Sequence, residues 1–279
     1  MRHTRYPALL LAAVLLLCAC SPSTEPESLL EIVCFDVGQG DSTLLRTREG
    51  DILIDAGPED AQDTLCHKLH SLGVESLALL ILTHPDEDHV GGGDGVLREF
   101  PTDEVWVNGA EEESESYSRL TNAMRLAELT PRTVGAGDYG SFGDTVITVL
   151  APRSGSASSG NEGSLVLLVR CGDFSMLLMG DAEGSTEKWL LQNYDPPQLQ
   201  SDVLHVGHHG SNTSGTADFL EVVQAEYAVI SCGAGNLYGH PDGRALTRLE
   251  AAGTEILRTD LLGDILIRVP SDGAGFSIS

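Results

Sequence analysis

The stretch His84-Pro85-Asp86-Glu87-Asp88-His89 follows Thr83 at the end of the apolar run Leu77–Leu82, and it decides the interpretation of this chain. Four candidate metal ligands fall within six positions, directly after a segment with the composition of a strand buried on both faces. Clustered carboxylates and imidazoles repel one another and desolvate poorly, so they stabilise little unless a positive charge lies between them. The stretch therefore predicts a site for a divalent cation, and two cations would use its ligands better than one.

Later apolar runs also end in a glycine followed by an acid or a histidine. Leu177-Leu178-Met179-Gly180-Asp181 is one such run, and Leu204-His205-Val206-Gly207-His208-His209 is another. His240 follows a third strand-like run through a loop that contains glycines, and Asp36, Asp41 and Asp55 close the early runs. Glycine lets the backbone approach a ligand closely, and rigid strand ends hold side chains accurately. These groups are therefore expected to converge on residues 84–89.

The N-terminus has the pattern of an export signal. Arg2 and Arg5 precede the apolar residues 8–17, a run shorter than the roughly 20 residues that a membrane-spanning helix needs. Leu17-Cys18-Ala19-Cys20 resembles a lipobox, which predicts cleavage before Cys20 and a membrane anchor through a lipid on that residue. We therefore expect a lipoprotein signal peptide over 1–19, a tether over 20–29 and one domain over 30–279. The protein is then exported and lies on the outer face of the cell membrane, or is secreted; an ordinary cleaved signal or an uncleaved anchor is the alternative.

The chain is strongly acidic. It has 16 Lys and Arg against 42 Asp and Glu, and its formal charge of −26 becomes −28 when Arg2 and Arg5 leave with the signal. Such a charge repels nucleic acid and anionic lipid headgroups within about 8–10 Å at physiological salt. The cysteines beyond the signal are scattered without a C-x-x-C spacing, which disfavours a zinc ribbon.

Short apolar runs alternate with segments of helical periodicity through the rest of the chain. Strand-like runs separated by glycine-containing turns cover 30–37, 42–46 and 51–55. Helical patterns are predicted over 61–72, 117–129, 183–193, 217–224 and 245–252. This order predicts two sheets packed between helices in one domain.

Several motifs together resemble the metallo-β-lactamase fold, and most closely its branch found as the C-terminal domain of the competence protein ComEC. The motifs are Phe35-Asp36-Val37-Gly38-Gln39-Gly40-Asp41-Ser42, Ile54-Asp55-Ala56-Gly57, residues 84–89 with Gly91-Gly92, Leu178-Met179-Gly180-Asp181-Ala182 and Gly207-His208-His209-Gly210-Ser211. The resemblance covers roughly residues 30–270. It implies an α/β (α+β) fold, a four-layer αββα sandwich, in a stand-alone exported relative.

The resemblance also implies a ligand set for two divalent metal ions, zinc or manganese. The family motif H-x-H-x-D-H has Asp86 in place of its second histidine here. By resemblance His84 and Asp86 bind one metal, Asp88 and His89 bind the other, and Asp181 bridges them. His208 or His209 completes the set. A carboxylate in place of an imidazole makes the first site harder and favours manganese somewhat.

Some positions have competing interpretations. The family often offers a histidine between the motifs of His89 and Asp181, but residues 90–180 contain none, so Asn161, Ser164 or water is expected there. Asp181 is also a candidate helix N-cap. His240 is either a substrate or proton-transfer residue or part of a tight turn.

The remaining polar residues near these motifs are given more modest roles. His205 is expected to be packed within a strand, and Asp55 is expected to orient a ligand histidine. Asp36 and Asp41 are turn formers or line the site. The acidic residues 111–113 are expected to form a solvated face.

The predicted function is metal-dependent hydrolysis of a phosphodiester by an activated water. Asp88 or Asp181 orients that water, and His240, His208 or His209 protonates the leaving group. The acidity favours a small phosphodiester, a nucleotide or single-stranded nucleic acid over a duplex, although a local basic patch is conceivable from Arg132, Arg153, Lys188, Arg244, Arg248 and Arg258. The alternatives are hydrolysis of carbonyl esters or lactams, a degenerate enzyme, and a non-catalytic metal-binding surface protein. No protein partner is evident from the sequence.

Overall fold

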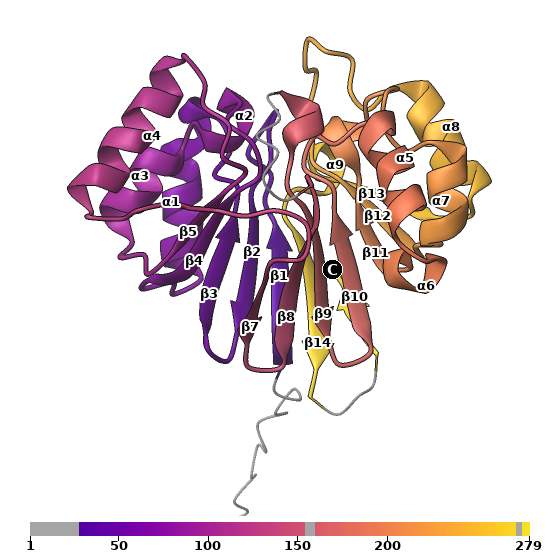
Figure 1. Ribbon diagram of the computed structural model, residues 1–279, viewed down its shortest axis with the longest axis horizontal. Helices are drawn as coiled ribbons and strands as arrows, with labels where there is room; N and C mark the ends of the chain where they lie inside the picture. The colour runs from indigo at the N-terminus through magenta and orange to yellow at the C-terminus, as the bar shows by residue number, and fades with distance from the viewer. Residues whose placement is uncertain (1–27, 154–159, 272–274) are drawn as a thin grey trace, which may run out of the picture.

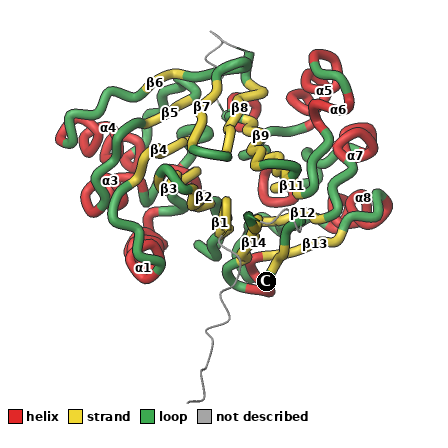
Figure 2. The backbone as a smooth tube through the Cα atoms, turned by 90° about the horizontal axis from the view of Figure 1, so that it is seen from below, coloured by secondary structure: helices red, strands yellow, loops and turns green. Residues whose placement is uncertain are grey.

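The structure is a computed structural model that describes residues 28–153, 160–271 and 275–279. Two β-sheets face each other and helices cover both outer faces, as Figures 1 and 2 show from two directions. The predicted four-layer αββα sandwich is confirmed. The predicted signal peptide, Cys20 and most of the tether lie outside the described residues.

The first sheet has eight strands. Their order is β15 (Ser277–Ile278), β14 (Ile265–Pro270), β1 (Ser28–Cys34), β2 (Thr43–Thr47), β3 (Gly50–Ile54), β4 (Leu77–Leu82), β5 (Val105–Val107) and β6 (Arg132–Thr133). Strands β3 to β6 run parallel to one another, whereas β15, β14, β1, β2 and β3 pair antiparallel.

The second sheet has seven strands. Their order is β13 (Glu255–Arg258), β12 (Tyr227–Ile230), β11 (Val203–His205), β10 (Phe174–Leu178), β9 (Val166–Cys171), β8 (Thr145–Ala151) and β7 (Tyr139–Phe142). Strands β10 to β13 are parallel, and β7 to β10 are antiparallel.

The helices divide between the two outer faces (Figure 1). The first face carries α1 (Gln62–Ser71), α3 (Gly93–Glu99) and α4 (Glu115–Leu126), and the short α2 (Glu87–Val90) lies above it at one end. The second face carries α5 (Gly184–Asn193), α6 (Pro196–Leu199), α7 (Ala217–Val223) and α8 (Gly243–Ala251), and α9 (Thr259–Leu262) follows β13. Within the described residues, we find no helix with the length and hydropathy to cross a membrane.

Three apolar layers explain this arrangement. One lies between the sheets, and one lies between each sheet and its helices. Strand β4 contributes Leu79 and Ile81 to the layer between the sheets and Leu80 and Leu82 to the layer under the helices. Both of its faces are therefore covered, which is why its sequence is apolar throughout.

Two helices have ends that differ from the predicted ones for identifiable reasons. Helix α4 begins at Glu115 because the Ser114 side chain accepts a hydrogen bond from Tyr117 N. It ends at Leu126 rather than 129, and Glu128 has a left-handed backbone with φ of 57°. Helix α8 begins two residues early, at Gly243, because Asp242 caps it.

The four described cysteines are buried thiols, and none of them forms a disulfide with another described residue. Cys34 and Cys171 lie in the layer between the sheets, as their apolar surroundings in the sequence predict. Burial raises the pKa of Cys34, Cys66 and Cys232 to about 12. These thiols are therefore packing groups rather than nucleophiles at neutral pH.

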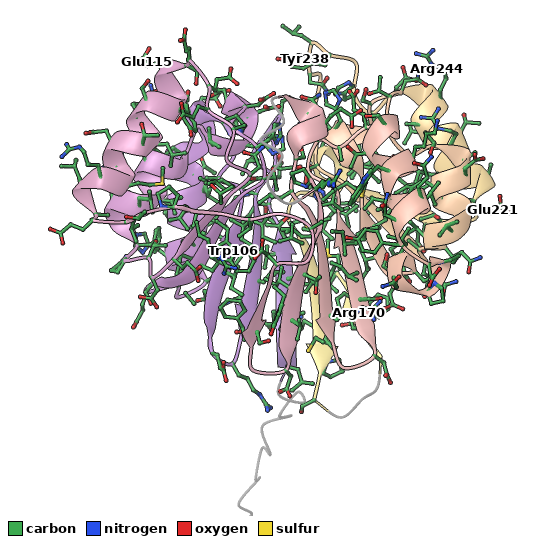
Figure 3. All side chains as sticks on the ribbon, in the orientation of Figure 1. Trp106, Glu115, Arg170, Glu221, Tyr238 and Arg244 are labelled. Carbon is green, nitrogen blue, oxygen red and sulfur yellow. The ribbon has the colours of Figure 1, made fainter. Side chains whose placement is uncertain are left out.

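The strand directions bring the ligand-rich loops together. Parallel β3 and β4 in one sheet and parallel β10, β11 and β12 in the other all end near the same edge of the sandwich. Helix α2 and the loop that carries Tyr238 lie at this edge (Figures 1 and 3). Residues separated by more than a hundred positions thus meet where the two sheets face each other.

Candidate metal centre

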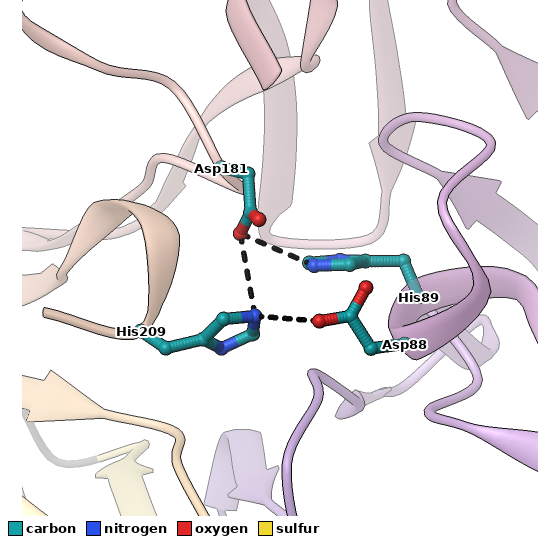
Figure 4. Close-up of side chains that lie close together, drawn as sticks. All are labelled: Asp88, His89, Asp181 and His209. Carbon is teal, nitrogen blue, oxygen red and sulfur yellow. Dashed lines mark hydrogen bonds and ion pairs between the residues drawn. The ribbon is translucent and has the colours of Figure 1, made fainter. Parts of the chain in front are cut away.

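Asp181 lies at the middle of the cluster and has histidines on two sides. Its Oδ1 is 3.1 Å from His89 Nε2 and 3.6 Å from His209 Nε2 (Figure 4). Its Oδ2 is 3.8 Å from His84 Nε2 and 3.8 Å from His208 Nε2. Each carboxylate oxygen therefore faces its own pair of imidazoles.

The Oδ1 side of Asp181 is the more compact group. Asp88 Oδ2 lies 3.1 Å from His209 Nε2, and Asp88, His89, Asp181 and His209 each offer one ligand atom within 4.8 Å of the others. Asp88 and His89 come from α2, Asp181 from the end of β10, and His209 from the loop after β11 (Figure 4). Four donors from three elements can surround one cation.

The Oδ2 side is looser. His84 is fully buried, and its Nε2 lies 3.7 Å from Asp86 Oδ2. His208 approaches from the opposite loop and is partly exposed. These three residues and the shared Asp181 form the second candidate set.

Unpaired buried atoms test whether the cluster suits a cation. His84 Nε2, His89 Nε2 and Asp181 Oδ1 are buried and have no hydrogen-bond partner among the described residues. The 3.1 Å approach of His89 to Asp181 therefore has the distance but not the orientation of a hydrogen bond. Leaving such atoms unpaired costs free energy, whereas one cation in each of the two groups would satisfy all three. The cluster fits, and suggests, a dinuclear metal site.

Asp55 holds the ring of His89. It accepts hydrogen bonds from Thr83 N at 2.8 Å, from Thr83 Oγ1 at 2.7 Å and from His89 Nδ1 at 2.8 Å. Since Nδ1 donates to this carboxylate, Nε2 of His89 is left to face the centre. The predicted contact between Asp55 and a histidine of the site is confirmed.

His208 and His209 both reach Asp181, whereas the sequence left open which of the two would do so. Both have left-handed backbone conformations, with φ of 49° and 52°. His209 Nδ1 donates to the Ser231 carbonyl at 3.0 Å, and His208 Nδ1 lies 2.8 Å from Glu183 Oε1. The unusual backbone directs the two rings to opposite oxygens of Asp181, at a cost of about 1–3 kcal/mol per residue that a functional site can justify.

The interpretation of Asp181 as a helix N-cap is wrong, because α5 begins at Gly184 and Glu183 occupies the N-cap position. Asn161 and Ser164 do lie beside the cluster. Asn161 Nδ2 is 3.1 Å from His208 Nδ1, and Ser164 Oγ accepts from Asp181 N at 3.1 Å. Asn161 therefore contacts His208, and Ser164 contacts the backbone of Asp181.

The surrounding residues have the modest roles expected of them. His205 is buried and lies 2.9 Å from Ser231 Oγ, which agrees with a packed histidine. Asp36 accepts from Gly38 N and forms a turn. Asp41 is buried beneath the centre, with Oδ1 3.7 Å from His209 Nδ1.

His240 lies at the rim. Its ring centroid is 5.2 Å from that of His208, and its buried Nδ1 has no partner among the described residues. Asn236 Oδ1 accepts from His240 N at 3.0 Å and from Tyr238 N at 3.1 Å, so one amide shapes the loop. These contacts place His240 at the rim of the site, and not only in a turn.

The charge balance of the centre attracts cations. Burial lowers the pKa of His84 to about 3, so its ring is neutral near pH 7 and has a lone pair to offer a cation. Burial opposes ionisation of Asp88, but the hydrogen bond with His209 and the charge of His89 lower its pKa to about 2. Burial also acts to lower the pKa of His209, yet the charges of Asp181 and Asp41 raise it to about 9. The negative charges of the carboxylates thus stabilise positive charge at the centre.

A cleft of about 1170 Å³ opens beside the cluster, with Asp86 and Asp88 among its lining residues. Its walls also carry Asp36, Glu59, Asp60, Glu87, Glu112 and Tyr238. Glu112 was expected on a solvated face, and no pattern in the sequence indicates its place on this wall. Glu112 is exposed. Burial of Asp86 is the main cause of the raised pKa of Asp86, and the negative charge of Glu112 is the second cause.

The basic residues considered for a local patch do not line this cleft. Arg132 pairs with Asp138, Arg244 with Asp242 and Arg258 with Asp260. Arg248 binds the carbonyls of Asn212, Ser214 and Gly215. Their charges are used locally.

Comparison with known proteins agrees with this geometry. Residues 35–234 match the family model described as the metallo-beta-lactamase superfamily, and the chain belongs to that superfamily. It is 30% identical over 266 residues to ComE operon protein 3 of Bacillus subtilis, covering 89% of this chain and 34% of that protein. It is 35% identical over 243 residues to competence protein ComA of Neisseria gonorrhoeae, covering 87% of this chain and 33% of that protein.

The predicted relationship to the competence proteins is confirmed, and the chain spans about a third of the length of these relatives. Among solved structures, CmlA β-hydroxylase from Streptomyces venezuelae has a TM-score of 0.54 at 15% identity, covering 88% of this chain and 55% of that one. YhfI from Bacillus subtilis has a TM-score of 0.51 at 11% identity, covering 82% and 96%. These two likenesses show the fold. Membership of the superfamily supports a metal-dependent hydrolase.

Proposed function

We propose that the chain is a metal-dependent phosphodiesterase whose reaction takes place at Asp181. One observation carries the proposal: the two oxygens of this buried carboxylate face separate groups of imidazoles, and buried atoms of both groups are unpaired. A carboxylate shared by two donor groups suits the chemistry of a two-metal hydrolase.

The proposed ligands follow from the distances. His84, Asp86 and His208 would hold one cation, and Asp88, His89 and His209 would hold the other, with Asp181 shared. Zinc and manganese are the proposed metals, since imidazole and carboxylate together suit both. When bound, such ions lower the pKa of a water molecule and polarise the oxygen under attack.

The chain's own groups orient the reactants. Asp88 and Asp181 accept hydrogen bonds from the attacking water and aim it at phosphorus. The water oxygen bonds to phosphorus, one P–O ester bond breaks, and a proton passes to the departing alcohol. His240 is placed to relay that proton from solvent, because its ring lies at the rim beside His208 and its backbone is held by Asn236.

Phosphodiester substrates are proposed ahead of carbonyl esters or lactams because two of the similar proteins are a competence protein and, in Haemophilus influenzae, recombination protein 2. Recombination acts on nucleic acids, whose backbone is a chain of phosphodiester bonds. The acidic composition favours a small diester or a single strand over a duplex.

The test uses purified residues 21–279, which retain every described residue. Metal content is measured first, and bis-p-nitrophenyl phosphate, single-stranded DNA and nitrocefin are then assayed with added Zn²⁺ or Mn²⁺. Hydrolysis of a phosphodiester that is lost in a folded Asp181→Ala variant supports the proposal. Two bound metals without turnover indicate a binding protein instead, and hydrolysis of nitrocefin alone indicates a lactamase.

We also propose export with a lipid on Cys20, and a single folded domain over 30–279. Cells that express the full chain are labelled with a clickable palmitate analogue. The label is expected on the wild type and not on Cys20→Ser. A labelled Cys20→Ser chain contradicts the lipid attachment site. Limited proteolysis is expected to leave one resistant fragment that begins near residue 30.

A further inference from the structure

The walls of the cleft are more acidic than a site for a polyanion should be. Seven of the described residues that line it are carboxylates, and none is Lys or Arg. A nucleic acid strand places a phosphate at every nucleotide, and proteins that bind such strands meet them with basic side chains. This cleft offers the opposite charge.

Two of the wall carboxylates are uncompensated. Glu59 pairs with Arg119 at 2.6 Å, and Glu87 accepts from Glu59 N. Asp60 and Glu112 have no hydrogen-bond or ion-pair partner within the part of the chain that the structure describes. Asp60 precedes α1 and Glu112 precedes α4, so two separate segments bring unpaired negative charge to one cleft.

An aromatic ring lines the same cleft. Tyr238 is 73% exposed, and its ring lies 5.9 Å from that of His240 with an interplanar angle of 24°. Figure 3 shows Tyr238 at the end of the molecule where the two halves of the sandwich meet. Asn236 holds the backbone of this residue through the hydrogen bond from Tyr238 N.

The cleft leads to the reaction centre rather than to an inert surface. Asp86 and Asp88 line it, and behind them His84, His89 and Asp181 are buried with unpaired atoms directed into the centre. A substrate whose phosphorus lies at the centre can therefore place its other substituent in the acidic cleft. An aromatic face and carboxylates together are a common way to bind an alkylammonium group.

We infer that the substrate is a small phosphodiester with a cationic alkylammonium substituent, which lies against Tyr238 and near Asp60 and Glu112. The inference rests on the proposed phosphodiesterase function and names its substrate class. A diester of this kind carries one negative charge at the phosphorus and one positive charge in the cleft, so it complements both parts of the site.

A matched pair of substrates tests the charge alone. p-Nitrophenyl phosphorylcholine is compared with p-nitrophenyl 3,3-dimethylbutyl phosphate. The second ester, the isostere, has the same leaving group and the same phosphate charge, but carbon replaces the quaternary nitrogen, so its substituent is uncharged. Residues 21–279 loaded with the metal that gives the most activity are expected to show kcat/KM about tenfold higher for the choline ester, as a cation–π contact with nearby carboxylates predicts. The ratio of kcat/KM for the choline ester to kcat/KM for the isostere is expected to fall as NaCl rises from about 20 to about 500 mM, because salt screens the exposed charges of the cleft.

The variant pair locates the effect. Asp60→Asn with Glu112→Gln is expected to bring the ratio close to one, because kcat/KM falls more for the choline ester than for the isostere. Tyr238→Leu is expected to lower the ratio by several-fold. Asp218→Asn with Glu221→Gln makes the same change of charge on exposed α7 and is expected to leave the ratio as in the wild type.

The outcomes separate the two proposals. Hydrolysis of both esters with equal kcat/KM overturns the cationic substituent and leaves the phosphodiesterase standing. A higher kcat/KM for a dT15 oligonucleotide than for the choline ester also overturns it. No hydrolysis of any diester with either metal overturns the phosphodiesterase, and this inference falls with it.

Discussion

Asp55 accepts a hydrogen bond from His89 at 2.8 Å while its own backbone is left-handed, with φ of 57°. The same carboxylate binds the backbone and hydroxyl of Thr83, next to His84. One residue at the end of β3 thus orients the start and the end of the ligand-rich hexapeptide. Its position explains how a short loop can present several charged groups in a defined geometry.

Asp55→Asn is expected to weaken metal binding by about 10–100-fold, the usual effect of losing a carboxylate behind a ligand histidine. Asparagine tolerates the left-handed backbone, so the variant should fold. Competition with a coloured chelator measures the affinity. Asp51→Asn, on the same strand and paired with Arg46, is the control and should bind as the wild type does. Equal affinity in the two variants contradicts the orienting role.

His208→Ala is expected to reduce the metal content from two ions per chain to one, because only the looser group on the Oδ2 side of Asp181 loses a donor. His209→Ala should instead weaken the compact group. Elemental analysis after gel filtration gives the stoichiometry. His67→Ala, an exposed position on α1, serves as the control. Two tightly held ions in His208→Ala would remove His208 from the ligand set.

Gly40→Ala is expected to destabilise the fold much more than Gly38→Ala. A Cβ at Gly40 would collide with the Asp88 carbonyl, which also accepts a hydrogen bond from Asp41 N. Gly38 also has positive φ but open space around it, so its replacement should cost about 1 kcal/mol. Thermal unfolding of the two variants makes the comparison. Equal melting temperatures would mean that the loop relaxes away from Asp88.

Glu187 gives a test of pH dependence away from the metal centre. It is buried and accepts hydrogen bonds from Gly215 N and Thr216 N, and burial is the main cause that raises its pKa above 4.5. Because the folded-state pKa is raised, its contribution to stability is fully present below about pH 4.5 and decreases as the pH rises through the folded-state value.

The unfolding free energy of the wild type minus that of Glu187→Gln should therefore decrease as the pH rises from 4.5 to 7. Urea unfolding across this range measures it. Glu221→Gln, an exposed position on α7, should show no such trend. A difference that grows with pH would mean that the hydrogen bonds of Glu187 outweigh its burial.

Much of the site could be predicted from local pattern. The position of Asp181 after an apolar run and a glycine marked it as a site residue, and the contact of Asp55 with a histidine followed the expected logic. The helix ends at α4 and α8 were misplaced because capping by Ser114 and Asp242 depends on side-chain geometry. The sequence left open which of His208 and His209 approaches Asp181, because their left-handed backbone breaks the regular pattern.

The sequence by itself determined the sandwich and the residue types at its reactive edge, since apolar periodicity and strand-end glycines are local properties of the chain. Only the tertiary structure decided that the two histidines divide between the oxygens of Asp181, and that Asp60 and Glu112 line one cleft with Tyr238. These relationships join segments far apart in the chain. Packing of the two sheets sets their distances, and no local pattern encodes them.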